Sequence, residues 1–270
     1  MSKVIMIVSD ALRDDVARQY MGYLEHLVET KQATRYTVTG ELPSMSRPIY
    51  ETLHTGVPTS EHGIVNNAIV RRSHMPNVFD LAVKAGKVTA AAAFCWYSEL
   101  YNSAPFDPLM DREVDNEALA IQHGRFYMSE EFPDLDLYGQ GAVLAVKYQP
   151  DYLLIHPMGL DTVGERHGGS STLYHKQAIL QDGIISYLMP AALGLGYTIL
   201  ITADHGISDE GIHGGSLDVM RNVPLYVIRP DLTGAGDTDE TLSQLCIAPT
   251  LCRLLDLPIP STMKHAPLVI

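Results

Sequence analysis

Short apolar runs of strand length alternate along this chain with stretches in which apolar residues recur every three or four positions. Residues 3–9 (KVIMIVS) form a continuous apolar run of the kind that is buried on both faces in a parallel sheet. Similar runs predict further strands at residues 35–39, 88–94, 152–155, 197–202 and 224–228. Helical spacing predicts helices at residues 14–30, 48–55, 78–85, 139–148, 171–193 and 241–255.

This alternation of strands and helices predicts a three-layer α/β/α sandwich with a mainly parallel central sheet. Neither an internal repeat nor a linker interrupts it, so we expect one domain over residues 1–270. The least regular stretch, residues 97–140, is rich in aromatic and acidic residues. We interpret it as a small insertion or lid on the substrate side.

The composition excludes several other classes of protein. Of the 270 residues, 46% are hydrophobic, which offsets the cost of ordering the chain and excludes disorder as its main state. The three cysteines, Cys95, Cys246 and Cys252, each lie in an apolar stretch. We therefore expect the three cysteines to be buried free thiols in a reducing compartment.

The charge balance bears on partners and location. Lys and Arg number 19 against 32 Asp and Glu, a net charge of −13, which disfavours nucleic-acid binding. A small phosphorylated substrate stays compatible if metal cations supply positive charge. No apolar run reaches the roughly 18–20 residues that span a bilayer, so no membrane insertion is expected. The first residues lack the features of a signal peptide, and we expect a cytoplasmic protein.

Acidic and histidine residues follow the predicted strands, at the sheet edge where open α/β sheets gather functional groups. They are Asp10, Asp161, Asp204, His205 and His213. Taken singly, Asp10 is better explained as a turn or capping residue and His213 as a solvated loop residue. Their joint occurrence indicates a metal site instead, because carboxylate oxygen with imidazole nitrogen suits Zn²⁺, Mn²⁺ or Fe.

A second signal is Ser46-Arg47-Pro48 at the start of a short predicted helix. A helix N-terminus presents unpaired amides to an anion, and Pro is tolerated in its first turn. Ser46 is therefore well placed as a nucleophile, with a plain helix cap as the alternative. Ser44, two residues earlier, lacks the x-Pro context. Arg47 could contact a substrate phosphate or pair with an acidic neighbour such as Glu51.

Taken together, these motifs resemble those of the alkaline phosphatase superfamily, in particular its type I phosphodiesterase and nucleotide pyrophosphatase family. The match runs in order from residue 3 to about residue 260, without residues 90–145. It consists of the strand ending in Asp10, Ser46-Arg47-Pro48, Thr55-Gly56, His62-Gly63-Ile64 with Asn67 after it, Asp161-Thr162-Val163-Gly164-Glu165, Asp204-His205-Gly206 and His213-Gly214-Gly215.

The resemblance implies a catalytic site with two divalent metal ions. One ion would be held by Asp161, His213 and either Glu165 or His167. The other would be held by Asp10, Asp204 and His205 and would contact Ser46. Zn²⁺ is favoured, with Mn²⁺ or Mg²⁺ as alternatives. Asn67, with Asn66 as its neighbour, maps onto the family's phosphate-holding Asn.

Two positions depart from the family pattern. The nucleophile is Ser46, whereas nucleotide pyrophosphatases usually carry Thr and alkaline phosphatases Ser. Glu165 stands where the family has a ligand His, and His167 follows two residues later. Direct ligation by Glu165 is favoured, and it would make the site harder and more tolerant of Mn²⁺ or Mg²⁺. Ligation by His167 and a solvated Glu165 are the alternatives.

The resemblance therefore implies a metal-dependent hydrolase of phosphodiester or nucleotide pyrophosphate bonds that works through a covalent Ser46 intermediate on a small substrate, such as a nucleotide. A phosphomonoesterase or phosphonate hydrolase is the alternative within the superfamily. A catalytically silent metal- or ligand-binding protein is the alternative of another class. Six aromatic residues could stack on a substrate or cover the core edge: Trp96, Tyr97, Tyr101, Phe106, Phe126 and Tyr127. His156 is expected to be a packed or hydrogen-bonded strand-end residue and not a metal ligand.

Overall fold

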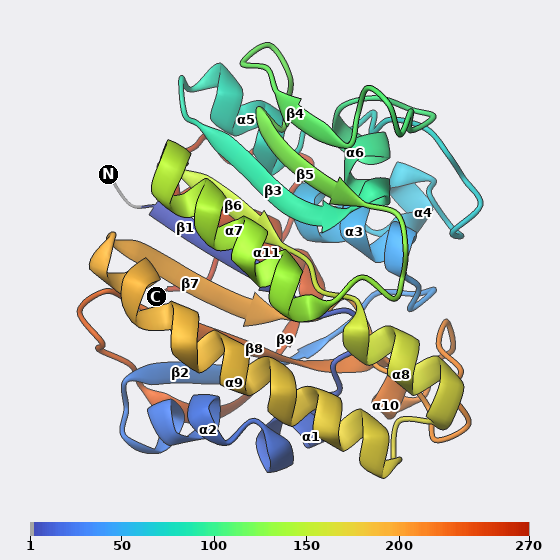
Figure 1. Ribbon diagram of the computed structural model, residues 1–270, viewed down its shortest axis with the longest axis vertical. Coiled ribbons are helices and arrows are strands. Elements are labelled where there is room, and N and C mark those ends of the chain that lie inside the picture. Colours follow the sequence, from blue (N-terminus) through green and yellow to red (C-terminus); the bar gives the residue numbers. More distant parts are fainter. Residues whose placement is uncertain (1–2, 270) are drawn as a thin grey trace.

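The computed structural model describes residues 3–269, in which a nine-stranded sheet lies between two layers of helices (Figure 1). The strands are ordered β4-β5-β3-β6-β1-β7-β8-β2-β9. Their bounds are β1 Lys3–Val8, β2 Ala33–Thr39, β3 Thr89–Phe94, β4 Glu113–Asp115, β5 His123–Tyr127, β6 Tyr152–Ile155, β7 Tyr197–Thr202, β8 Asn222–Ile228 and β9 Gly236–Ser243. Within the described residues five neighbouring pairs are parallel and three antiparallel, which confirms the predicted sandwich with a mainly parallel sheet.

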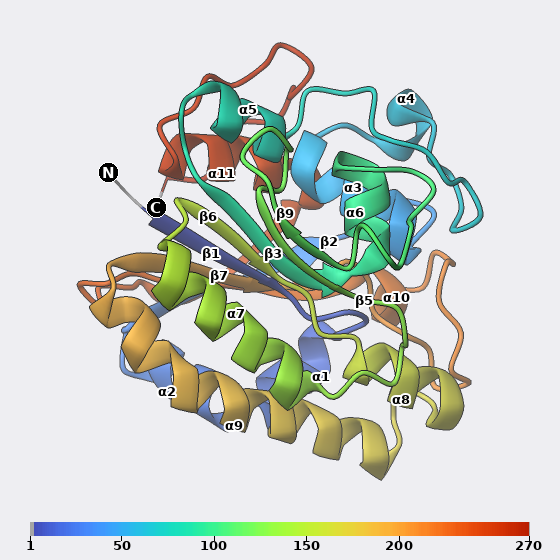
Figure 2. The ribbon, with the colours of Figure 1, turned by 45° about the horizontal axis from the view of Figure 1, so that its top comes forward.

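The helices separate cleanly into the two layers when the molecule is turned (Figure 2). One face carries α1 Asp14–Tyr20, α2 Gly22–Glu29, α7 Asp134–Tyr148 and α9 Thr172–Gly194, with α8 Gly159–His167 toward one end. The other face carries α3 Ser46–Thr55, α5 Val78–Lys84, α6 Cys95–Tyr101 and α11 Ile247–Leu254. The short helices are α4 Thr59–His62, α10 Asp218–Arg221 and the 3₁₀ turn Gln244–Cys246.

The central strands β6, β1 and β7 are neighbours and run parallel. Residues on both faces of β1 are buried, as its continuous apolar run predicts for a strand covered on two sides. Because the three strands are parallel, the chain leaves all of them at one edge of the sheet. That edge is where the predicted metal ligands follow.

Two predicted elements differ from the structure, and two stretches form elements that were not predicted. The helix predicted at residues 241–255 begins with the end of β9, because Thr241–Ser243 pair with β2 before α11 starts. The helix predicted at residues 14–30 is two helices, since the backbone of Met21 leaves helical geometry before Gly22. Residues 159–167 form α8, where the sequence predicted no helix. Part of the stretch 97–140 extends the sheet, because β5 pairs with β3 and β4 pairs with β5.

The cysteines agree with expectation: Cys95, Cys246 and Cys252 are free and buried. Among residues 3–269, no helix combines the length and apolarity needed to cross a membrane.

Candidate active site

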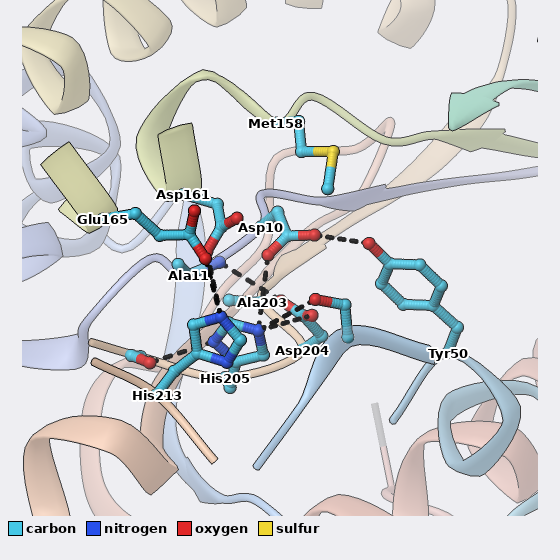
Figure 3. A network of polar contacts seen from close by, with 12 residues as sticks. Asp10, Ala11, Tyr50, Met158, Asp161, Glu165, Ala203, Asp204, His205 and His213 are labelled. Atoms are coloured by element: carbon cyan, nitrogen blue, oxygen red, sulfur yellow. Dashed lines mark hydrogen bonds and ion pairs between the residues drawn. The ribbon is translucent and has the colours of Figure 1, made fainter. Parts of the chain in front are cut away.

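Three acidic side chains from different parts of the chain meet at the carboxyl edge of β1, β6 and β7 (Figure 3). Asp10 follows β1, Asp161 lies in the first turn of α8 after β6, and Asp204 follows β7. His205 and His213 join them, so all five residues that the strand-end pattern singled out come together. The parallel order of the central strands explains this convergence.

The first group of potential metal ligands is Asp10, Asp204 and His205, all fully buried. His205 Nε2 lies 3.3 Å from Asp204 Oδ2 and 3.5 Å from Asp10 Oδ1. Ser46 Oγ lies 3.2 Å from the same nitrogen of His205. The nucleophile candidate therefore faces this group, as the resemblance implies.

The second group is Asp161, His205 and His213. The two imidazole rings are stacked with centroids 4.2 Å apart, so His205 lies within reach of both groups. His213 Nε2 is 3.9 Å from Asp161 Oδ1. The assignment by resemblance gave His205 to one ion only; the geometry places it between the two groups.

Glu165 and His167 were the two candidates for completing the second group. Glu165 Oε1 lies 3.1 Å from His213 Nε2, and Figure 3 shows its carboxylate beside Asp161. His167 is the last residue of α8 and its side chain is exposed. Glu165 therefore lies beside the second group, and its ligation of a cation stays a prediction.

Several buried ligand atoms in these groups make no hydrogen bond within the described residues. They are Asp10 Oδ1, Asp161 Oδ1, Asp204 Oδ2 and His213 Nδ1. Buried polar atoms are normally paired, and clustered carboxylates repel one another. In each group the carboxylate oxygens and imidazole nitrogens lie within 4.8 Å of one another, a donor set that suits divalent cations. Bound cations would pair with the unpartnered atoms and offset the repulsion between the carboxylates. The residues therefore fit the metals that the family implies.

The pKa values of the cluster are also set by burial and by the charges within it. Burial, together with the charge of Asp10, raises the pKa values of Asp161 and Asp204 well above their usual range. Burial would also raise the pKa of Asp10, but hydrogen bonding and charge from His156, with the charge of His205, lower it to about 2. Burial lowers the pKa of His205 to about 4. His205 is thus neutral near pH 7, the state in which imidazole binds metals.

The start of α3 positions Ser46. The side-chain oxygen of Asn67 accepts a hydrogen bond from the Arg47 amide at 3.0 Å, which ties the Asn67 loop to the first turn of the helix. The hydroxyl of Ser44 donates to the Gly215 carbonyl at 2.7 Å. Ser46 is thus the one of the two serines that contacts His205. Gly56 ends α3 in the left-handed conformation, as the sequence predicted for a helix stopped there.

Arg47 pairs with an acidic residue, but with a different one from that predicted. Its Nη2 lies 2.7 Å from Glu99 Oε2, and its guanidinium stacks over Trp96 at 4.4 Å. Glu51 instead accepts hydrogen bonds from Ser73 and Tyr101. Since Arg47 is buried and ion-paired, the structure favours a structural role over contact with substrate.

The aromatic residues of the stretch 97–140 mostly cover the core. Tyr97, Tyr101, Phe126 and Tyr127 are buried, and Trp96 is engaged with Arg47. This arrangement favours the packing alternative over stacking on a substrate. The assignment of the stretch to the substrate side stays a prediction.

Tyr50 and His156 form a support for Asp10 that sequence reasoning missed. Tyr50 donates its hydroxyl to Asp10 Oδ2, and His156 Nε2 lies 3.1 Å from the same oxygen. His156 is in turn bound by the hydroxyl of Tyr127, which donates to its carbonyl at 2.7 Å. His156 was expected to be a packed or hydrogen-bonded strand-end residue, which agrees with these contacts, but its partner Asp10 was not predicted. For Tyr50 a signal existed, because it follows Ser46 by four residues and so shares its helix face.

We expect Tyr50→Phe to lower the free energy of unfolding by about 1–3 kcal/mol and turnover by about 10-fold, because the buried Asp10 Oδ2 loses one of its two hydrogen-bond partners. Tyr97→Phe is the matched control. Tyr97 is stacked on Tyr50 with centroids 4.4 Å apart, and its hydroxyl has no partner among the described residues. Urea denaturation and steady-state kinetics measure both variants. Equal effects of the two substitutions would contradict the support of Asp10 by Tyr50.

Comparison with known proteins bears on this site. The model of the family described as type I phosphodiesterase / nucleotide pyrophosphatase matches residues 4–220. The catalytic subunit of human GPI ethanolamine phosphate transferase 2 is 26% identical over 275 residues, which cover 96% of this chain and 27% of that protein. The catalytic subunit of human GPI ethanolamine phosphate transferase 3 is 23% identical over 253 residues, covering 90% of this chain and 20% of that protein. The chain thus spans about a quarter of the length of these relatives.

Solved structures share the fold. Murine ectonucleotide pyrophosphatase / phosphodiesterase 5, an inactive variant in complex with AMP, has a TM-score of 0.74 at 15% identity, covering 96% of each chain. The phosphonate monoester hydrolase of Agrobacterium radiobacter has a TM-score of 0.70 at 14% identity, covering 99% of this chain and 76% of that one. At these identities the likeness concerns the arrangement of the sheet and helices.

Proposed function

The chain belongs to the type I phosphodiesterase / nucleotide pyrophosphatase family of the alkaline phosphatase superfamily, and from this premise we propose that it cleaves phosphodiester or nucleotide pyrophosphate bonds with Ser46 as nucleophile. The observation that carries the proposal is the position of Ser46 Oγ. It lies at the first residue of α3, 3.2 Å from His205, beside a buried acidic cluster with unpaired oxygens. A structural serine has no need of these neighbours.

In the proposed reaction, Ser46 Oγ forms a bond to phosphorus while the bond to the leaving oxygen breaks with its electron pair. The product is a phosphoryl- or nucleotidyl-serine, which water then cleaves at phosphorus to restore Ser46. Divalent cations, when bound by Asp10, Asp204 and His205 and by Asp161, Glu165 and His213, would favour the serine alkoxide and neutralise charge on the phosphate. Zn²⁺ is the cation we favour, with Mn²⁺ or Mg²⁺ as alternatives.

The remaining groups of the site would bind and orient the phosphate. The amides of the first turn of α3 offer partial positive charge to its oxygens. Asn67 uses its oxygen to accept from the Arg47 amide, which leaves its NH₂ group to donate to a non-bridging oxygen. Asp10 is held in place by Tyr50 and His156, so its free oxygen keeps one orientation. Such preorganisation stabilises charge as it develops in the transition state.

A transferase is a second candidate. The same seryl intermediate would be released by an alcohol in place of water, with the alcohol oxygen forming the new bond to phosphorus. The names of the human relatives, both ethanolamine phosphate transferases, favour this candidate. Hydrolase and transferase share every step up to the intermediate, so the site geometry is compatible with both.

Chromogenic substrates test the proposal. We expect turnover of bis-p-nitrophenyl phosphate and of p-nitrophenyl thymidine monophosphate to exceed turnover of p-nitrophenyl phosphate. EDTA should abolish this activity, and Zn²⁺ or Mn²⁺ should restore it. Adding ethanolamine or glycerol distinguishes the two candidates, because a transferase forms the new ester at the expense of hydrolysis. Full activity of metal-stripped protein would refute the reaction. Inactivity on every substrate and metal would favour the phosphonate hydrolase or silent-protein alternatives.

A further inference from the structure

Arg47 is a charged side chain that is buried directly beside the proposed nucleophile. Only 1% of its surface is exposed, and its guanidinium lies between Glu99 and the ring of Trp96. Its Nη1 makes no hydrogen bond among residues 3–269. A buried ion pair loses the hydration of both charges and is often no more stable than two apolar side chains of similar volume. A gain in stability therefore does not explain why Arg47 and Glu99 lie in the core.

Arg47 holds Asn67 at two points. Its backbone N–H donates to Asn67 Oδ1, and its side-chain Nε donates to the Asn67 carbonyl, both at 3.0 Å. Asn67 makes no other hydrogen bond within the described part of the chain. One residue of α3 thus fixes both the side chain and the main chain of Asn67.

The loop that contains Asn67 has little support of its own. Residues 63–77 form neither helix nor strand, and the residues on either side of Asn67 are exposed. Loops with few buried contacts open more readily than packed helices do. The position of the Asn67 NH₂ group therefore depends largely on its attachment to Arg47.

Helix α6 holds the guanidinium of Arg47 in place. Helices α6 and α3 pack against each other in the same layer (Figure 2). Trp96 and Glu99 lie three residues apart on α6 and share one of its faces. The ring centroid of Trp96 lies 4.4 Å from Arg47 Cζ, and Glu99 Oε2 lies 2.7 Å from Arg47 Nη2. Glu99 is itself fixed, because its Oε1 accepts from the amide of Phe106 at 3.1 Å.

We propose that Arg47 is a positioning residue that acts through Asn67 and does not contact the substrate. This role rests on the proposed function, in which the Asn67 NH₂ group donates to a non-bridging phosphate oxygen. Ser46 and Arg47 are consecutive residues of α3, so one helical turn positions both the attacking oxygen and the amide donor. Their spacing then stays fixed while charge develops on the phosphate, which is when a preorganised donor is most effective.

The shape of the guanidinium matters for this role as well as its charge. Nε donates to the Asn67 carbonyl while Nη2 pairs with Glu99, so the two contacts use different nitrogens of one planar group. Lysine has a single ammonium group and lacks this fork. Arg47→Lys should therefore keep the positive charge and still lower kcat nearly as much as Arg47→Met. A fully active Arg47→Lys would show that charge suffices and would overturn the proposed role.

A double-mutant cycle on the full chain tests the coupling of Arg47 to Asn67. With bis-p-nitrophenyl phosphate, we expect Asn67→Ala and Arg47→Met each to lower kcat by about 10²-fold and to change KM far less, because the lost donor acts on charge that develops in the transition state. The double variant should be about as slow as the slower single variant, since both substitutions remove the same interaction. Losses that multiply in the double variant would contradict action through Asn67.

Stability measurements separate this role from a purely structural one. Glu99→Gln removes the charge that Arg47→Met leaves unpaired, and it keeps an oxygen for the Phe106 amide. We expect the variant with both substitutions to have a Tm close to that of wild type and to be slowed by about 10²-fold, because a buried ion pair adds little net stability. A kcat that falls only in proportion to Tm would assign Arg47 a structural role alone.

Arg35→Met is the matched control. Arg35 is another buried arginine, and it pairs with Glu25 of α2, which lies in the other helix layer, and with Asp237. Its loss leaves two carboxylates without their partner, so Tm should fall while kcat stays unchanged. An equal loss of kcat in Arg35→Met would show that the effect of Arg47→Met is not specific to its place beside Asn67.

Limited digestion with trypsin tests the attachment of the loop without any turnover. The loop contains two cleavage sites, Arg71 and Arg72. Arg47→Met should speed cleavage there several-fold, because the loop loses a hydrogen bond to α3, whereas Arg35→Met should not. Unchanged cleavage in Arg47→Met would overturn the positioning role. A wild type that turns over no phosphate ester with any cation is the separate result that would overturn the proposed function.

Discussion

Replacement of Ser46 by alanine is expected to lower turnover of phosphate esters by about 10³- to 10⁶-fold while the protein stays folded. Ser46 Oγ is the atom that would form the covalent bond to phosphorus, so alanine removes the reacting group itself. The fold should tolerate the change, because alanine is a good helix former and the hydroxyl contacts His205 but does not cap α3. Steady-state kinetics with bis-p-nitrophenyl phosphate and circular dichroism measure the two effects.

Ser44→Ala is the matched control for this prediction. Ser44 is two residues away and equally buried, but its hydroxyl donates to the Gly215 carbonyl. We expect Ser44→Ala to cost about 1 kcal/mol of stability and to leave most of the turnover. Intact-mass spectrometry of rapidly acid-quenched reactions should detect a covalent phosphorus adduct in the wild type and none in Ser46→Ala. Retention of activity by Ser46→Ala, with loss in Ser44→Ala, would exchange the roles of the two serines.

The central strands could be predicted because their signal is local. The runs at Tyr152–Ile155 and Tyr197–Thr202 have the predicted bounds, since strands buried on both faces are apolar at every position. The convergence of Asp10, Asp161 and Asp204 follows from the same fact, because parallel neighbours end at one edge. The sequence placed each of these residues after a strand, and the parallel order of the strands then brings them together.

The errors arose where pairing with a distant segment decides the structure. The end of β9 lies where a helix was predicted, and it is fixed by its contact with β2, some two hundred residues away in the chain. The pairing of Arg47 with Glu99 depends equally on how α6 packs against α3. Propensity is a weak guide wherever tertiary contacts of this kind compete with it. The support of Asp10 by His156 could not be predicted for the same reason.

The acidic cluster is costly to the fold when no cation is bound. Asp10, Asp161 and Asp204 are buried together, and burial with mutual repulsion raises the pKa values of Asp161 and Asp204. An acid whose pKa is higher in the folded state contributes stability below its unfolded pKa of about 3.9, and this contribution is lost as the pH rises. Metal-free protein should therefore be less stable at pH 7 than near pH 4 as far as these groups are concerned.

Asp204→Asn should consequently have opposite effects on the metal-free and metal-loaded protein. In the wild type, Asp204 Oδ1 accepts a hydrogen bond from the backbone N–H of Ala11 at 3.2 Å. The side chain of the Asn variant keeps an oxygen for this bond but removes one negative charge from the cluster. In EDTA at pH 7 we expect the variant to be more stable than wild type by about 1–3 kcal/mol, a rise in Tm of several degrees. This gain should shrink toward pH 4, where Asp204 of the wild type is protonated in the folded state.

With Zn²⁺ or Mn²⁺ the order should reverse, since a ligand that binds only the folded state stabilises it by about 4 kcal/mol at a thousand times its Kd. The wild type would gain this stabilisation, whereas the variant would lose most of it. The turnover of the variant should also fall by at least about 10³-fold. Asp136→Asn, an exposed carboxylate on α7, controls for the change in net charge and should show neither effect. Thermal denaturation with EDTA and with each cation decides the matter. If metal stabilised wild type and Asp204→Asn equally, Asp204 would not belong to a cation site, because a ligand's removal must weaken the binding that it supports.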